Sequence, residues 1–124
     1  MQPYFFVRHE GRYIKLSVRE ILYVESVKNY VRVVTTGKSY LLLISLRQME
    51  EELPKELFCR VHRGYLVSLP HIISFDNNTV QVDKKQIPIS EQYRQILFSR
   101  VKILISDTRQ KNTLDKLDID SFLN

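Results

Sequence analysis

Apolar and β-branched residues gather in short runs along the first ninety residues of the chain, and polar or turn-forming residues separate these runs. Val, Ile, Tyr, Phe and Thr dominate the runs, a composition typical of β-strands. We therefore expect strands at residues 4–8, 12–16, 21–27, 31–35, 39–44, 58–61, 65–68, 72–75, 79–82 and 86–89.

Four of the separating segments contain residues that tolerate the positive φ of tight hairpins. These segments are Glu10-Gly11, Thr36-Gly37-Lys38, Asp76-Asn77-Asn78 and Asp83-Lys84-Lys85. Because short turns of this kind join strands that run in opposite directions, most neighbouring strands should be antiparallel.

Two segments carry the signals of short helices instead. Ser45 followed by Gln48 matches a capping box, and Pro54 ends the segment. Its apolar residues fall on one helical face: Leu46, Met49 and Leu53. The second helix is predicted to begin at Ser90, with Arg94 and Arg100 facing away from its apolar stripe. That stripe comprises Tyr93, Ile96, Leu97 and Val101.

The end of the chain differs from the rest. Residues 106–113 are polar and indicate a linker, and the apolar residues after them could form one more amphipathic helix. These apolar residues are Leu114, Leu117, Ile119 and Phe122. We therefore expect one mainly β domain at residues 1–100 with two or three short helices, and a C-terminal extension at 101–124.

Charge is unevenly distributed along the chain. The 124 residues carry a formal net charge of +5, of which residues 112–124 contribute −2, leaving +7 for residues 1–111. A basic body of this kind favours a polyanionic partner such as nucleic acid.

Catalytic and metal-binding groups are sparse. Neither His9, His62 nor His71 stands at metal-ligand spacing with Cys59 or an acidic pair, and no nucleotide-binding loop is present. The acidic run Glu50–Glu52 lies on the polar side of the first helix, where we expect it to be solvated. We therefore predict no enzyme, no metal and no cofactor.

The single cysteine and the lack of long apolar runs bear on the compartment. Cys59 cannot form an internal disulfide, and at the start of a predicted strand it resembles a small buried hydrophobe. No apolar run approaches the roughly 20 residues of a membrane span, and the N-terminus lacks a secretory pattern. These features predict a cytoplasmic protein without membrane contact.

Basic and polar residues at three interruptions of the strands are candidates for nucleic-acid contacts. They are Lys28, Asn29 and Tyr30; Arg60, His62 and Arg63; and Ser90, Gln92 and Arg94. Asn29 could bond an adenine edge, Arg63 a guanine edge or a phosphate, and the helix start at Ser90 a phosphate. We expect Gly64 to give the backbone the freedom for a sharp turn from which Arg63 projects.

Each candidate also has a structural alternative. Tyr30 could return to the core from a polar hairpin tip, and His62 could bond a nearby carbonyl. Glu91, in the first turn of the second helix, could act only as an acid favoured by the helix dipole.

Several separated blocks, in order, resemble a known family. They are Ile21-Leu22-Tyr23-Val24-Glu25 with Asn29-Tyr30-Val31, then Ser45-Leu46, then Phe58-Cys59-Arg60-Val61-His62-Arg63-Gly64-Tyr65-Leu66-Val67, and finally Ile87-Pro88-Ile89-Ser90 with Tyr93. Over about residues 3–99 the chain resembles a LytTR domain, and the Arg-Val-His-Arg-Gly-Tyr block is its most specific part. LytTR domains are mostly β-strand DNA-binding modules of bacterial transcription regulators, commonly attached to a receiver domain, and they use loops and strand ends for DNA.

The resemblance implies specific duplex binding by the nine candidates and regulation of transcription within a two-component system or by a stand-alone factor. Lys28, Arg60, Arg94 and the helix start at Ser90 would hold phosphates, while Asn29, Arg63 and His62 would read bases. In this family Arg often follows the serine, whereas this chain has Glu91, which cannot hold a phosphate but can accept from cytosine.

The implied partners are double-stranded DNA, a receiver domain or sensor kinase, and a second copy of the chain on DNA. Two other functions are consistent with the residues alone. One is an OB-type single-strand binder, for which Tyr4 and Phe6 have the required spacing, and the other is a basic protein-interaction module.

Overall fold

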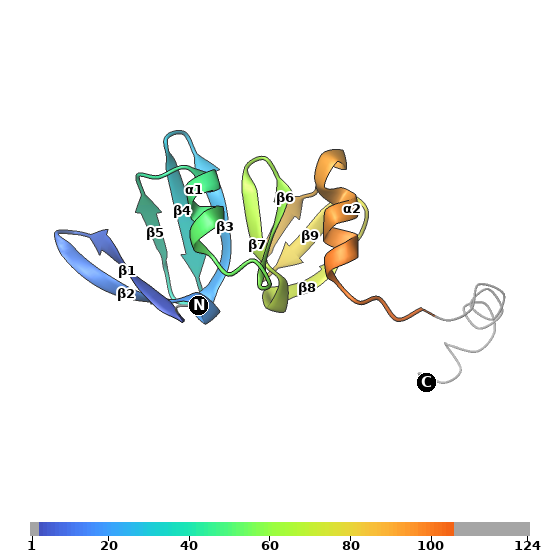
Figure 1. Cartoon of the computed structure of the whole chain (residues 1–124), viewed down its shortest axis with the longest axis horizontal. Coiled ribbons are helices and arrows are strands. Elements are labelled where there is room, and N and C mark those ends of the chain that lie inside the picture. Colours follow the sequence, from blue (N-terminus) through green and yellow to red (C-terminus); the bar gives the residue numbers. More distant parts are fainter. Residues whose placement is uncertain (1–2, 106–124) are drawn as a thin grey trace.

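The structure, a computed structural model, describes residues 3–105 and contains ten strands and two α-helices (Figure 1). The strands are β1 (Tyr4–His9), β2 (Arg12–Ser17), β3 (Ile21–Val27), β4 (Tyr30–Thr35), β5 (Ser39–Leu42), β6 (Phe58–His62), β7 (Tyr65–Ser68), β8 (Ile72–Phe75), β9 (Thr79–Val82) and β10 (Lys85–Pro88). The helices are α1 (Leu46–Glu52) and α2 (Glu91–Arg100), and short 3-10 turns span Val18–Glu20 and Leu69–His71. The predicted strands agree with these to within two residues at each end.

The strands form three antiparallel sheets side by side, which confirms the prediction from the turns (Figure 1). β1 and β2 make a hairpin, the central sheet has the order β5-β4-β3-β7-β6, and the third sheet has the order β10-β9-β8. The central sheet is open, with β5 and β6 at its edges, so the closed barrel of an OB-type protein is not the fold.

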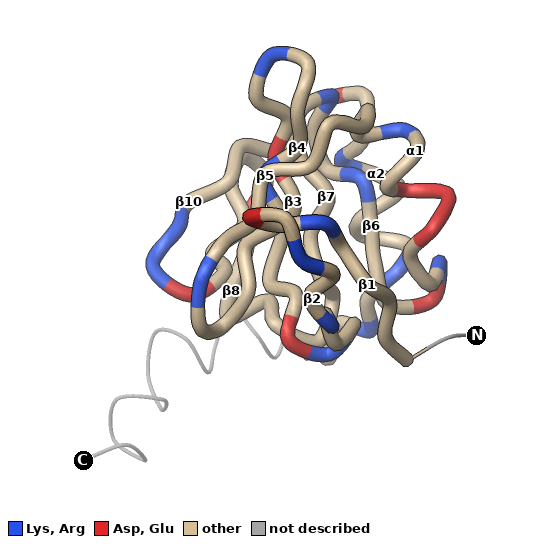
Figure 2. Tube along the Cα trace, turned by 90° about the vertical axis from the view of Figure 1, so that its left-hand side faces the viewer, with Lys and Arg blue, Asp and Glu red and all other residues tan. Residues whose placement is uncertain are grey.

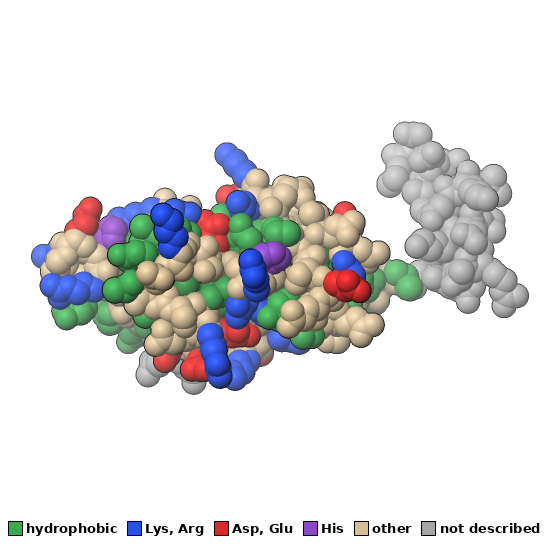
Figure 3. Space-filling view, turned by 90° about the horizontal axis from the view of Figure 1, so that it is seen from above, with side chains coloured by type: hydrophobic (Ala, Val, Ile, Leu, Met, Phe, Trp, Pro, Cys, Tyr) green, Lys and Arg blue, Asp and Glu red, His purple; other side chains and the backbone are tan. Residues whose placement is uncertain are grey.

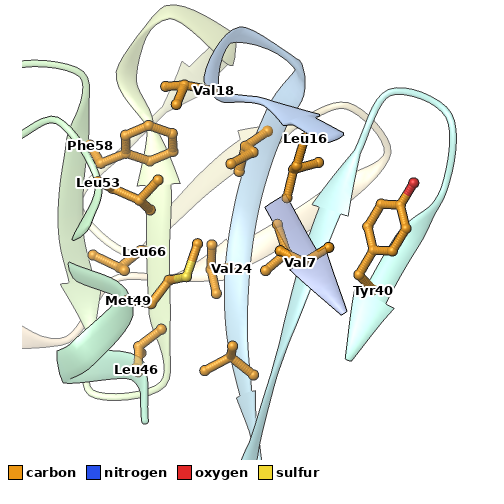
Figure 4. Packing of buried hydrophobic residues seen from close by; sticks show 13 residues of the cluster. Val7, Leu16, Val18, Val24, Tyr40, Leu46, Met49, Leu53, Phe58 and Leu66 are labelled. Atoms are coloured by element: carbon orange, nitrogen blue, oxygen red, sulfur yellow. The ribbon is translucent and has the colours of Figure 1, made fainter. Parts of the chain in front are cut away.

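Both faces of the central sheet are buried. Successive residues of β7, Leu66 and Val67, belong to opposite hydrophobic clusters, as the alternation of side chains along a strand requires. The first cluster joins the sheet to the β1–β2 hairpin and α1. Figure 4 shows Met49 of α1 beside Val24 and Leu66, with Leu53, the residue after the helix, close by. The second cluster joins the other face to the third sheet and α2.

Helix α1 begins as predicted. The Ser45 hydroxyl accepts from the Gln48 amide at 3.0 Å, and the Gln48 side chain accepts from the Ser45 amide at 3.0 Å, which completes the capping box. Leu46, Met49 and Leu53 are all buried, as their shared face predicts.

Helix α2 also begins after Ser90, but its predicted stripe is wrong at one residue. Leu97 is fully buried and Val101 packs at the cluster margin, whereas Ile96 is 47% exposed. α2 packs mainly on β6, so only a narrow line of its side chains reaches the core. Ile96 lies one position around the helix from that line and faces the groove beside Arg100.

The turns use glycine less than expected. Positive φ occurs at Gly11 but also at Glu10, Lys28 and Asp83, while Gly37 and Gly64 lie outside the left-handed region. After β4, the Thr35 hydroxyl accepts from the amides of Gly37 and Lys38 and so closes the turn with a side chain. Gly64 lies in the sharp turn expected there, with Arg63 exposed, but the turn does not use the left-handed region at Gly64.

No helix among residues 3–105 is long and apolar enough to cross a membrane. The predicted helix at Leu114–Phe122 lies outside the described residues, and the division of the chain near residue 100 stays a prediction.

Candidate nucleic-acid interface

The three predicted segments meet at one end of the molecule, the upper end in Figure 1. The β3–β4 turn lies beside the β6–β7 turn because β3 pairs with β7, and the Ser26 amide donates to the Gly64 carbonyl at 2.9 Å. The start of α2 is tied to β6 by the Ser90 amide, which donates to the Val61 carbonyl at 3.0 Å. Backbone hydrogen bonds thus hold residues that are far apart in the sequence side by side.

Seen from above, this end presents Lys and Arg side chains along its whole length, with Asp and Glu side chains between them (Figure 3). Among residues 3–105, His, Cys, Asp and Glu do not gather in threes as a metal site requires. The charged side chains of this surface supply hydrogen-bond donors and acceptors.

The β3–β4 turn projects from this end, and Figure 2 shows a basic residue at its tip. That residue is Lys28, held at a φ of 57°, and both Lys28 and Asn29 are exposed. Tyr30 is 44% exposed and lines an apolar groove with Leu41 and Leu43, so the alternative in which it returns to the core is wrong.

Burial changes from residue to residue at the β6–β7 turn. Val61 is fully buried, Arg60 and His62 are half-buried, and Arg63 is exposed in the turn. Arg60 pairs with Leu66 and His62 with Tyr65, so simple alternation along β6 does not hold here. The register of β6 against β7 shifts between Arg60 and His62, which marks an irregularity just before the turn.

Arg60 uses its guanidinium within the protein. Its Nε donates to the His62 carbonyl at 2.9 Å, one Nη donates to the Arg63 carbonyl, and the other donates to Glu50 at 2.9 Å. The ring of Tyr93 lies 5.9 Å from its Cζ, and the side chain is only 17% exposed. The predicted phosphate contact at Arg60 therefore competes with three intramolecular acceptors.

His62 is held by the turn that it precedes. Its Nδ1 accepts from the Gly64 amide at 3.0 Å, and its ring packs edge-on against Tyr65 at 5.7 Å. The expected alternative paired this ring with a carbonyl, whereas here an amide is the partner. Because Nδ1 accepts, the ring proton of neutral His62 lies on Nε2, which can donate to a base or a phosphate.

The N-cap residue of α2, Ser90, makes no side-chain capping bond. The Ser90 hydroxyl is buried without a hydrogen-bond partner among the described residues and does not cap the helix. Glu91 and Gln92 are exposed in the first turn, where amide groups of a helix lack partners. Arg94 donates from Nε to the Asn77 carbonyl at 2.7 Å, which ties α2 to the β8–β9 turn.

Sequence reasoning missed Glu50, which belongs to the acidic run predicted to be solvated. Its carboxylate pairs with Arg60, whereas Glu51 pairs only with the exposed Arg47 of its own helix at 3.7 Å. Glu50 directly follows the buried Met49, so it lies at the border of the apolar face of α1. That border position was the one available signal.

Cys59 lies beneath this site and is buried, as predicted. Burial raises the pKa of its thiol, and Arg100 opposes the rise. The thiol is therefore part of the core rather than of the surface chemistry.

Comparison with known families gives one match over most of the chain. The LytTr DNA-binding domain matches residues 11–113. The structure resembles the solved LytTr DNA-binding domain of a putative methyl-accepting/DNA response regulator from Bacillus cereus. The TM-score is 0.72 at 19% identity, and the match covers 83% of this chain and 100% of that one.

Curated relatives are longer proteins. An uncharacterized response regulatory protein of Yersinia pestis is 34% identical over 99 residues, which are 75% of this chain and 40% of that protein. Sensory transduction protein LytT of Bacillus anthracis is 26% identical over 100 residues, covering 76% of this chain and 41% of that protein. The heme-containing CO-sensing transcriptional regulator RcoM 2 of Paraburkholderia xenovorans is 29% identical over 91 residues, covering 68% and 34%. The chain thus spans about a third to two fifths of their length.

Proposed function

The chain belongs to the LytTr DNA-binding domain family, and on that basis we propose that it binds duplex DNA sequence-specifically and regulates transcription. The observation that carries the proposal is the convergence of the β3–β4 turn, the β6–β7 turn and the start of α2 at one end of the molecule. Turns and a helix start that project together can enter a groove and meet the phosphates on either side of it.

The proposed roles follow from exposure and hydrogen-bonding capacity. Lys28, Gln92 and the amide groups in the first turn of α2 contact phosphates, whereas Ser90, with its hydroxyl buried, positions this helix start. Arg94 adds a guanidinium from which, among the described residues, Asn77 takes only the Nε proton. Asn29, Arg63 and His62 read base edges, and Tyr30 lies at the margin of the contact.

The setting of the domain is also a proposal. Curated relatives with regulatory names are much longer than this chain, so we propose that it acts as the output module of a response regulator or as a stand-alone regulator in the cytoplasm. A receiver domain or a sensor kinase would then be its partner in signalling, and two copies would bind one DNA site.

Salt dependence of binding tests the proposal. A duplex should first be selected from a pool of short random duplexes with the 124-residue chain, and both the selected duplex and the starting pool then titrated at several salt concentrations. Contacts with about four to six phosphates predict a slope of log K against log salt of roughly −4 to −5. A matched single strand should bind more weakly, and a slope near zero on every duplex would contradict DNA binding.

A further inference from the structure

We propose that Arg60, supported by Glu50, is a positioning residue that holds the β6–β7 turn in the shape that reads DNA. The inference rests on the proposed function, but it assigns Arg60 a role different from the phosphate contact expected from the sequence. It also brings in Glu50 of α1, a residue outside the predicted interface.

The geometry of the guanidinium carries the inference. Two of the three acceptors of Arg60 are backbone carbonyls of His62 and Arg63, the two residues proposed to reach bases from this turn. The third is the Glu50 carboxylate, which approaches from α1 at 2.9 Å. The guanidinium spreads its donors over three nitrogens and so meets acceptors on different sides, whereas the three N–H groups of a lysine ammonium share one nitrogen.

The remaining bonds of the turn show what Arg60 completes. The Gly64 amide donates to the His62 ring, and the Gly64 carbonyl accepts from Ser26 of β3. With Arg60 on the carbonyls of His62 and Arg63, every residue from 62 to 64 has a backbone group in a specific hydrogen bond. A turn that is already ordered loses less conformational freedom when it binds.

Burial argues in the same direction. The Arg60 side chain is only 17% exposed, whereas Arg63 at the tip of the turn is exposed. Tyr93 of α2 lies beside the Arg60 guanidinium. Three of the five N–H groups of the guanidinium already have acceptors, and the low exposure of the side chain limits the approach of a phosphate to the other two. Glu50, at 42% exposure, would repel that phosphate.

The two roles predict opposite effects of removing the Glu50 carboxylate. Glu50→Ala should weaken binding to the selected duplex roughly three- to tenfold, with binding to the random pool nearly unchanged, because the turn loses its support. If Arg60 instead held a phosphate, losing Glu50 would free the guanidinium and strengthen binding to both DNAs. Glu51→Ala is the matched control. It removes the same charge one residue away, from a carboxylate whose ion-pair partner is the exposed Arg47 and not Arg60.

Arg60→Lys separates shape from charge. The variant keeps the positive charge but cannot reach all three acceptors, so preference for the selected duplex should fall while the salt slope stays the same. A phosphate-binding Arg60 predicts that lysine retains most of the affinity. If Arg60→Lys does not fold, as its melting curve will show, the comparison of Glu50→Ala with Glu51→Ala decides alone.

A measurement without DNA keeps the inference separate from the proposed function. Hydrogen exchange of the Gly64 amide should be faster in Glu50→Ala than in Glu51→Ala, because the turn opens more often. Unchanged exchange would overturn the positioning role even if the chain binds DNA. Faster exchange with unchanged preference for the selected duplex would also overturn it. Failure of the unmodified chain to bind any duplex would reject the proposed function, and the exchange result would still decide whether Arg60 holds the turn.

Discussion

The β3–β4 and β6–β7 turns are neighbours at the same end of the molecule, yet they are built in different ways. Arg60, the His62 ring and Ser26 hold the β6–β7 turn from three sides. The β3–β4 turn depends on the left-handed backbone of Lys28, and the described hydrogen bonds include none from the side chains of Lys28 or Asn29.

The difference indicates how one surface can combine two kinds of contact. A base edge must be met at fixed distances and angles, which favours an ordered turn. A phosphate can be met by a mobile ammonium group over a range of positions. We therefore expect the β6–β7 turn, here called the braced turn, to supply preference among DNA sequences. The β3–β4 turn, here called the free turn, should supply general affinity for DNA.

Replacing Arg63 tests the braced turn and has the largest expected effect. Arg63→Ala should cost about 1 to 3 kcal/mol on the selected duplex and little on the random pool, if its guanidinium reads a guanine. Arg94→Ala, at the start of α2, is the comparison and should weaken both DNAs alike. Parallel titrations of the two variants measure this. Equal losses on both DNAs for Arg63→Ala would assign Arg63 to the backbone, and unfolding of the variant would show a structural role.

Replacing Lys28 tests the free turn through both stability and binding. A residue with a Cβ in the left-handed region costs about 1 to 2 kcal/mol, and glycine relieves this strain while adding about 0.5 to 1 kcal/mol of unfolded-chain entropy. Lys28→Gly should therefore raise the free energy of unfolding by about 0.5 kcal/mol in urea denaturation, whereas Lys28→Ala should not.

Both Lys28 variants remove the same charge, so both should reduce the salt slope of DNA binding by about one. Their effect should be the same on the selected duplex and the random pool. A loss confined to the selected duplex would mean that the β3–β4 turn also reads sequence, and the contrast between the two turns would fail.

The sequence predicted the strands, the antiparallel pairing and the α1 capping box because these depend on residues close together in the chain. Alternation, turn residues and the Ser45–Gln48 pair are all local signals. That the candidate segments act together on one DNA duplex was inferred from a family resemblance rather than from residue spacing.

Contacts between distant segments could not be predicted in this way. Glu50 meets Arg60 only because α1 packs over the central sheet, and Arg94 meets Asn77 across seventeen positions of the chain. Gly37 was misjudged because the Thr35 side chain closes that turn, and Ile96 because α2 touches the core along one narrow line. Each of these features depends on a contact with another part of the fold, and hydrophobic periodicity does not reveal such contacts.

The β8–β9 turn extends the comparison, since it is held by a carboxylate that loses its charge at low pH. The Asp76 carboxylate accepts from the amides of Asn78 and Thr79 at 2.8 Å each, and the neighbouring Asn77 carbonyl holds Arg94. These backbone donors favour the ionised carboxylate and lower the pKa of Asp76.

The lowered pKa gives the smallest of the expected effects, with a defined direction. The carboxylate stabilises the fold fully above its unfolded pKa of about 4, and that stabilisation is lost as pH falls through the lower folded pKa. Asp76→Asn keeps an oxygen acceptor but removes the charge, so its urea midpoint should lie below that of the unmodified chain at pH 7. The two midpoints should converge in acid. Glu56→Gln, an exposed carboxylate outside the turn, controls for the loss of one negative charge. A gap between Asp76→Asn and the unmodified chain that stays constant into acid would show that the carboxylate braces this turn through its shape alone, and the β8–β9 turn would then resemble the β6–β7 turn more closely than its charge suggests.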